Sequence, residues 1–352
     1  MKKLFFLSAT VIVLFADVSC CNQAEKPGVS AVIKEASPES AGVSSERLAR
    51  IDRMIQSAVD SGWIAGAVGF IARDSKIVYN KAFGVSDIEA GTPLKTDDIF
   101  RIASQTKAIT SIAAMMLFEE GKFLLDDPVS KYIPEFKNPQ VLDKFIENDT
   151  TFTTVPARRE VTIRDLFTHT SGIDYAGIGS PRMRAIYAKY GIPAGFGTDK
   201  MVLGEKMKAL GKLPLSHQPG ERFTYGLNVD LLGYLIEIWS GENLDQYFKK
   251  HIFEPLGMKD TYFYLPEEKH SRLVKVNSED SEHHVRSIPQ DEVNYPLLKG
   301  TYYSGGAGLS STIKDYAIFL QMLLNKGEYN GKKLLSRRTV ELITSNQIGD
   351  LN

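Results

Sequence analysis

The sequence predicts a mixed α/β fold in which an antiparallel sheet is flanked by helices. Two strand-like runs, Gly66–Ala72 and Lys76–Phe83, are separated by a short polar turn at Arg73–Ser75, which is typical of a β-hairpin. Apolar residues then recur at helical spacing within Ile99–Gly121. With 352 residues, of which 43% are hydrophobic, the chain is long enough to bury a substantial core.

The other elements follow in order from their caps and periodicity. Ser44 is a plausible N-cap for a helix that ends at Gly62. Thr162 caps a short helix that leads to His169. Further helices are predicted at 198–210, 229–240 and 314–325. The polar stretch 138–159 is expected to be an irregular surface excursion, and the glycine-rich stretch 172–197 to form a wall or lid.

The stretch Ile99–Gly121 is the element around which the chain is organised. Gly121 is the expected stop of its helix. Ser104 and Lys107 lie three residues apart near the start, so they project from the same side of the helix. The same spacing occurs at Ser311–Lys314, where we expect a helix cap and a solvated lysine instead. The apolar face of the first helix, which favours burial of Lys107, is formed by Ile109, Ile112, Ala113 and Met116.

Ser104, Lys107 and Tyr225 are the candidate catalytic residues. A serine hydroxyl is a poor nucleophile until a base removes its proton, and a lysine amine can be that base when burial or nearby cations lower its pKa. Attack on a carbonyl also requires a group that protonates the leaving atom. Tyr225 lies at a turn directly before a helix and is a candidate for this role, although by itself it could equally be one of the chain's ordinary tyrosines.

Several other classes of function are disfavoured. A net charge of −1 provides no basic surface for nucleic acid. No His-Glu-x-x-His or similar set of metal ligands occurs, and His283–His284 is expected to be solvated. Glycine-rich dinucleotide or phosphate loops are absent as well, since Ser304–Gly308 follows no βαβ pattern and is interpreted as a flexible turn. We therefore expect no metal and no cofactor, and we expect His169 to tie a helix end to a neighbouring loop.

The N-terminus predicts export. Lys2 and Lys3 precede the apolar run Leu4–Ala16, and small residues lead to Cys20 and Cys21, the only cysteines in the chain. Residues 1–21 are predicted to be a signal peptide, 22–38 a linker, and 39–352 the folded domain. The cysteines resemble a bacterial lipoprotein box, so membrane attachment through an N-terminal lipid and ordinary secretion to the periplasm both remain open. A monomer is expected.

Four separated motifs resemble those of the serine β-lactamase-related family, which includes class C β-lactamases, D,D-carboxypeptidases and β-lactamase-like carboxylesterases. The motifs are Phe100–Lys107, Val161–Gly172, Pro219–Gly233 and Phe253–Met258, and the resemblance extends over essentially all of 38–351. It implies a β-lactamase/transpeptidase-like fold with a helical region inserted between early and late strands. It also implies that Ser104 is the acylated nucleophile, Lys107 its general base and Tyr225 the first residue of a Tyr-x-Asn motif.

The sequence departs from the family pattern in two places. The motif reads Tyr225–Gly226–Leu227, with Asn228 one residue late, which is more similar to the esterase branch. Gly226, Leu227 and Asn228 are the candidate substrate-binding residues. After Gly308 nothing matches the Lys-Thr-Gly, His-x-Gly or Trp-x-Gly strand of the family, so the C-terminal strands are expected to be missing.

The resemblance implies an exported serine hydrolase that acts through a covalent acyl-enzyme. The expected substrate is a small molecule or a peptidoglycan-like compound with an ester, β-lactam or peptide-like carbonyl, and esters are preferred. The alternative is a catalytically impaired protein of the same fold that binds a ligand or acts as a scaffold, which the missing strands would favour.

Overall fold

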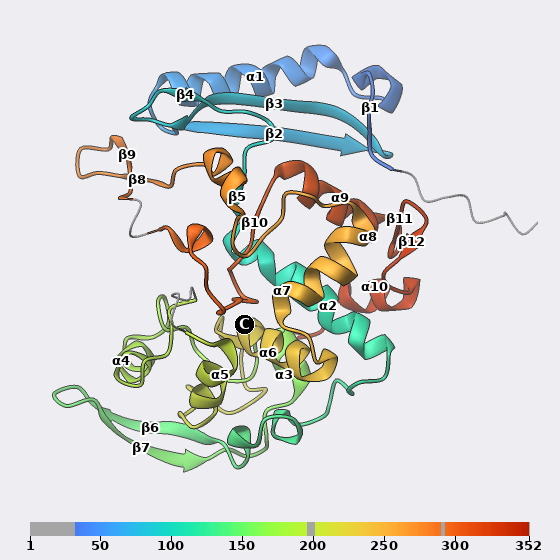
Figure 1. Cartoon of the computed structure of the whole chain (residues 1–352). Helices are drawn as coiled ribbons and strands as arrows, with labels where there is room; N and C mark the ends of the chain where they lie inside the picture. The colour runs from blue at the N-terminus through green and yellow to red at the C-terminus, as the bar shows by residue number, and fades with distance from the viewer. Residues whose placement is uncertain (1–31, 196–200, 290–292, 352) are drawn as a thin grey trace, which may run out of the picture.

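The structure, a computed structural model, describes residues 32–195, 201–289 and 293–351. The predicted signal peptide, with Cys20 and Cys21, and most of the predicted linker lie outside the described residues. Figure 1 shows a sheet at one end of the molecule and a largely helical region at the other, with α2 between them. Among the described helices, none is long and apolar enough to cross a membrane.

The sheet is built on the predicted hairpin. β2 (Gly66–Arg73) and β3 (Lys76–Asp87) pair antiparallel, β1 (Lys34–Glu35) runs parallel to β3, and β4 (Thr92–Pro93) is antiparallel to it. The turn at Asp74 and Ser75 has φ values of 52° and 60°. Two successive left-handed residues twist the chain in the sense that a two-residue hairpin needs. The predicted hairpin is therefore confirmed, and its second strand is longer than expected.

Helix α1 (Ser45–Asp60) follows the sequence prediction at both ends. The Ser44 hydroxyl accepts a hydrogen bond from the Arg47 N–H and so satisfies one of the free donors of the first turn. The chain leaves the helix through Gly62, which has a φ of 70°. Figure 1 shows α1 lying along one face of the sheet, with α9 on the opposite side.

The central helix, α2 (Thr106–Glu119), starts a few residues after Ser104 rather than at it. Residues Phe100–Arg101 form a short strand, β5, that pairs antiparallel with β10 (Ser310–Ser311). A 3₁₀ turn, Ala103–Gln105, joins β5 to α2. The helix ends at Gly121 as predicted, with a φ of 73°. The β5–β10 pairing therefore brings the residues before β10 to the start of α2.

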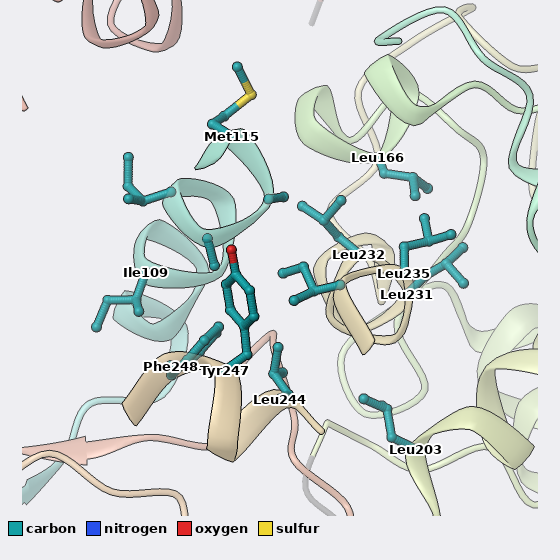
Figure 2. Close-up of a cluster of buried hydrophobic side chains, with 14 of the residues drawn as sticks. Ile109, Met115, Leu166, Leu203, Leu231, Leu232, Leu235, Leu244, Tyr247 and Phe248 are labelled. Carbon is teal, nitrogen blue, oxygen red and sulfur yellow. The ribbon is translucent and has the colours of Figure 1, made fainter. Parts of the chain in front are cut away.

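The core is centred on the contact between α2 and α6 (Asn228–Ser240). Figure 2 shows apolar side chains of both helices meeting in one cluster, and those that it labels on them are Ile109, Met115, Leu231, Leu232 and Leu235. All five are 2% exposed or less. α2 is buried on more than the one face that its periodicity predicted, because helices cover it on several sides.

The segment between α2 and β10 forms the inserted region, which is helical but not wholly so. Its helices are α3 (Ile163–Thr168), α4 (Pro181–Lys189), α5 (Leu203–Gly211), α6, α7 (Leu244–Phe248) and α8 (Glu254–Leu256). Its strands are β6 (Gln140–Ile146), β7 (Thr151–Pro156), β8 (Asn277–Glu279) and β9 (Val285–Ser287). The last part of the described chain contains α9 (Ile313–Leu324), β11 (Glu328–Tyr329), β12 (Lys332–Lys333) and α10 (Arg337–Ile343).

Two predictions in this region need correction. The stretch 138–159 is not irregular, because β6 and β7 pair antiparallel over most of it. Its β-branched residues favour a strand, but its low hydrophobicity hid the pattern. The helix predicted at 198–210 begins at Leu203, because Val202 is extended and pairs with Thr301. Residues 198–200 of that prediction lie outside the described residues.

His169 fixes the end of α3 to the loop that precedes α6, as the sequence predicted. It ends α3 in the left-handed region, with a φ of 56°. Its carbonyl accepts a hydrogen bond from the Thr224 N–H, and its Nδ1 accepts from the Gly226 N–H and lies 3.0 Å from the Asn228 amide nitrogen. Burial, assisted by the charge of Lys107, lowers the pKa of His169 to about 4. The His169 Nδ1 can accept these hydrogen bonds only when the ring is neutral.

We predict that Leu232→Ala lowers the free energy of unfolding by about 3 kcal/mol, because it leaves a cavity between α6 and α2. Leu232 is 0% exposed. Urea denaturation followed by circular dichroism measures the change. Leu324→Ala is the matched control, since Leu324 is 71% exposed and should cost less than about 0.5 kcal/mol. Equal losses in the two variants would contradict the packing described here.

We predict that His169 makes the protein less stable as the pH falls from about 6.5 to about 4. In this window the unfolded chain binds a proton at His169 that the folded protein does not bind, so about 3 kcal/mol of stability is lost on acidification. His169→Asn lacks this titration, and Asn tolerates a positive φ. The difference in free energy of unfolding between wild type and variant should therefore shrink from pH 7 to pH 4.5.

Urea denaturation at several pH values tests this pH dependence. His283→Asn controls for the substitution itself, because His283 also has a positive φ, 64°, and its side chain is 85% exposed. Parallel stability curves for wild type and His169→Asn over this range would contradict the prediction.

Candidate active site

Ser104 is presented by a strained turn directly before α2. Ala103, the residue before it, has a φ of 42°, although it is not a glycine. A residue with a Cβ atom in the left-handed region costs about 1–2 kcal/mol, so the surrounding structure must hold it there. The β5–β10 pairing on one side and α2 on the other provide that support. The Ser104 side chain is exposed as a result.

The structure brings together the three residues that the sequence singled out for chemistry. The Tyr225 hydroxyl donates a hydrogen bond of 2.6 Å to Ser104 Oγ. The Lys107 amine, Nζ, lies 3.3 Å from the same oxygen. Ser104 and Tyr225 are 121 residues apart in the sequence. The serine hydroxyl therefore has two groups beside it that can exchange protons with it.

Lys107 is half-buried and held on two sides. Its Nζ donates a hydrogen bond of 2.8 Å to the Gly306 carbonyl. The same nitrogen lies 4.6 Å from the centre of the Tyr225 ring and 5.6 Å from that of Tyr175. Aromatic faces attract an ammonium group, and the carbonyl fixes its direction. These contacts keep the amine beside Ser104 without an acidic partner at hydrogen-bond distance among the described residues.

Tyr225 packs against two aromatic rings. The His169 ring stacks on one side with a centroid separation of 5.0 Å, and the Tyr175 ring stacks with a separation of 5.7 Å. Tyr175 comes from the glycine-rich stretch that was predicted to form a wall, and it is buried. Because both neighbours are themselves fixed, the Tyr225 ring has little freedom to turn its hydroxyl away from Ser104.

The turn Ser304–Gly308 completes the site, and sequence reasoning missed it. All its residues are buried against α2 and α6, so the prediction of a flexible turn was wrong. A Cβ atom on Gly306 would lie 2.3 Å from Asp230 Oδ2, which is far too close. The run of glycines was the available signal, because close approach of two backbones is one reason for glycine. No signal in the sequence linked this turn to Lys107.

Gly226, Leu227 and Asn228 are not brought to Ser104. All three are buried, and the side chains of Leu227 and Asn228 are 0% exposed. A Cβ atom on Gly226 would lie 2.1 Å from the Ile173 carbonyl oxygen, so this glycine allows close packing. The Asn228 amide contacts His169 and Ser171. We therefore do not retain these residues as substrate contacts.

The second Ser-x-x-Lys copy has the structural role that the sequence predicted. Thr312 caps α9, its hydroxyl accepting a hydrogen bond from the Asp315 N–H, and Lys314 is exposed. His283 and His284 are exposed on the β8–β9 hairpin. Over the residues that the structure describes, no group of three or more His, Cys, Asp or Glu side chains could hold a metal ion.

A cavity of about 310 Å³ adjoins the Ser104 turn. It lies between β2, β5 and the start of α9, and its lining includes Val68, Phe100, Gln105 and Tyr316. This volume is within the range of small-molecule sites. Its lining reaches Gln105, the residue after Ser104, but includes none of Ser104, Lys107 and Tyr225.

Comparison with known proteins assigns the chain to a family. The family model described as Beta-lactamase matches residues 51–348. Esterase EstB from Burkholderia gladioli is 32% identical over 282 residues, which cover 76% of this chain and 67% of that protein. A protein of Escherichia coli strain K12, named as a candidate D-alanyl-D-alanine carboxypeptidase, is 32% identical over 357 residues, which cover 95% of this chain and 76% of that protein.

A solved structure gives the same result for the fold. The hydrolase EstCE1, described as having promiscuous acyltransferase activity, superposes with a TM-score of 0.70 at 28% identity, covering 84% of this chain and 76% of that one. The predicted β-lactamase/transpeptidase-like fold is thereby confirmed. The chain therefore belongs to the β-lactamase family of hydrolases, whose members similar to it are named as esterases and peptidases.

Proposed function

We propose that this protein is a serine hydrolase that cleaves esters through a covalent acyl-enzyme formed on Ser104. The observation that carries the proposal is the convergence of Tyr225 and Lys107 on Ser104 Oγ, at 2.6 Å and 3.3 Å. The three side chains come from distant parts of the sequence, and two of them are held by neighbours that fix their direction. Preorganisation of this kind is typical of nucleophilic catalysis.

In the proposed acylation step, Lys107 acts as an uncharged amine: Ser104 Oγ attacks the carbonyl carbon of the ester while this amine takes the hydroxyl proton. The carbonyl π bond breaks, and its electron pair forms an oxyanion that the Ser104 backbone N–H helps to stabilise. When the oxyanion collapses, the bond from carbon to the alcohol oxygen breaks. Tyr225 gives its proton to the leaving alcohol and regains one from Lys107. The products are an acyl-serine and the free alcohol.

In the proposed deacylation step, water attacks the acyl-serine, and the same two groups remove its proton. The bond from the acyl carbon to Ser104 Oγ breaks, the serine regains its proton, and a carboxylic acid leaves. Two bases beside one oxygen allow each proton to leave and return over a short distance, so the cycle needs no other group.

The Tyr225 loop favours esters over amides. The side chain that would offer an amide near the nucleophile, Asn228, is turned into the core and contacts His169 and Ser171. The next residue after Gly226, Leu227, is apolar and buried. The loop therefore contributes no side-chain amide that could hold a β-lactam or a peptide bond. The similarity to an esterase and to a hydrolase with acyltransferase activity supports the same choice.

We predict that the purified protein hydrolyses a short-chain p-nitrophenyl ester and that Ser104→Ala abolishes the activity. Tyr225→Phe keeps the ring stacking but removes the hydroxyl, and it should lower kcat by about 10²-fold or more, which is the usual effect of losing a general acid–base group. Lys107→Met should do the same. Release of p-nitrophenol measures the rates, and intact mass after reaction with a fluorophosphonate probe reports acylation of the serine.

Lys314→Met is the matched control, because this lysine has the same sequence spacing to a serine but is exposed in the first turn of α9. It should leave both kcat and probe labelling unchanged. Full esterase activity or full labelling in Ser104→Ala would refute the proposed mechanism.

We also propose that the protein is exported and anchored by a lipid on Cys20 or Cys21. The support is the basic and apolar N-terminal sequence that ends at these cysteines. In a bacterial host the full chain should incorporate an alkyne fatty acid and fractionate with membranes, and the Cys20→Ala/Cys21→Ala double variant should do neither. The single variants identify the modified residue. An unlabelled, cleaved protein in the soluble periplasmic fraction would indicate ordinary secretion instead.

A further inference from the structure

Asp230 is a buried carboxylate that the proposed reaction does not use. It lies in the first turn of α6 and is 0% exposed. Its Oδ1 accepts hydrogen bonds from the Ser304 hydroxyl at 2.6 Å and from the Gly306 N–H at 3.2 Å. Burying a carboxylate is costly, and it is usually tolerated only where the group has a specific task.

The turn that Asp230 binds is the turn that holds Lys107. Gly306 contacts both groups, since its N–H donates to Asp230 and its carbonyl accepts from Lys107 at 2.8 Å. The Ser304 hydroxyl also accepts from the Ala307 N–H, which closes the turn on itself. A single residue, Gly306, therefore separates a carboxylate on α6 from the amine beside Ser104.

We propose that Asp230 is a positioning residue, which fixes the Ser304–Gly308 turn so that the Gly306 carbonyl directs the Lys107 amine at Ser104. The inference rests on the proposed function of Ser104 and Lys107 and names a further residue on which that function depends. Asp230 touches no reacting atom and acts only through Gly306.

The surroundings of Asp230 explain why the contact is rigid. Its second oxygen, Oδ2, is buried without a hydrogen-bond partner among the described residues, so no competing contact pulls the carboxylate away from the turn. A side chain on Gly306 would collide with this oxygen. Burial raises the pKa of Asp230, and the nearby charge of Lys107 opposes that rise. Whether Asp230 is protonated or not, the turn requires that Oδ1 accept its hydrogen bonds.

The main test compares Asp230→Ala with Asp230→Asn. The alanine removes the acceptor and should free the turn, and a displacement of about 1 Å at a catalytic group costs up to about 10²-fold in rate. We expect kcat and the acylation rate constant to fall between about tenfold and about 10²-fold, with KM little changed. The asparagine keeps an acceptor oxygen in the same place and should restore most of the rate.

A matched control separates positioning from general stability. Asp315 is also a buried carboxylate with a pKa raised by burial, and it accepts hydrogen bonds from the Asp260 N–H and the Thr261 hydroxyl, which are not part of the site. Asp315→Ala should lower the melting temperature without lowering the acylation rate constant of the folded protein. If Asp230→Ala does not fold, Ser304→Ala removes one of the two contacts to Asp230 and should still slow acylation several-fold.

Crystal structures of wild type and Asp230→Ala make failure of this inference distinct from failure of the proposed function. If the wild-type protein does not react with a fluorophosphonate probe, the proposed function fails, whatever Asp230 does. The positioning role is supported if Lys107 Nζ loses its contact with Gly306 in the variant. It is overturned if that contact is unchanged, or if Asp230→Ala acylates within about twofold of wild type, a difference of under about 0.5 kcal/mol in the barrier.

Discussion

The structure depends on the hydrogen bonds that the few polar side chains of the buried helix α2 make. Helix α2 runs through the centre of the molecule, and Thr106 and Thr110 on its first turns are 0% exposed. The Thr106 hydroxyl accepts from the Leu309 N–H, and the Thr110 hydroxyl donates to the Gly305 carbonyl. Between these two contacts, the Lys107 amine donates a hydrogen bond to the Gly306 carbonyl. One turn therefore provides partners for three polar residues of α2, although Thr110 Oγ1 also lies 3.2 Å from the Thr106 carbonyl oxygen and the Lys107 amine also contacts Ser104.

This contact also explains why the site is assembled from distant parts of the chain. The Lys107–Gly306 contact joins residues 199 positions apart, and it lies next to the β5–β10 pairing, which is equally non-local. The segment between α2 and β10 is the inserted region, and it returns to the site three times. It does so at His169–Tyr175, at Tyr225–Asp230, where α6 packs against α2, and at the turn Ser304–Gly308.

The candidate site combines an exposed serine with rigid support. Ser104 is presented by a residue with positive φ, and Tyr225 is held by stacking and by the hydrogen bonds of His169 to its loop. The neutral state of His169 is essential to this support, because a protonated ring could not accept from the Gly226 N–H. Burial disfavours the charged form of His169. It therefore favours the neutral form, whose ring accepts the hydrogen bond from the loop.

The sequence by itself determined the elements whose signals are local. The hairpin of β2 and β3, the Ser44 and Thr162 caps and the stop at Gly121 were all predicted correctly, because each depends on neighbours within a few residues. Ser104 and Lys107 were found for the same reason, since three residues of a helix place them side by side. The structural role of His169 was also predicted correctly, although its partners Gly226 and Asn228 are 57 and 59 residues away.

Only the tertiary structure decided which other groups reach Ser104. The resemblance to a known motif named Tyr225 as a candidate, but only the packing of α6 shows that its hydroxyl reaches the serine. The sequence predicted that Asn228 contacts the substrate, but the same packing turns its side chain into the core. Asp230 and Gly306 gave no sign of a shared role, because the contact between them requires α2, α6 and β10 to be in place together. Long-range packing decides which of these side chains reach the site, and for that reason the local sequence gave no sign of the roles of Asp230 and Gly306.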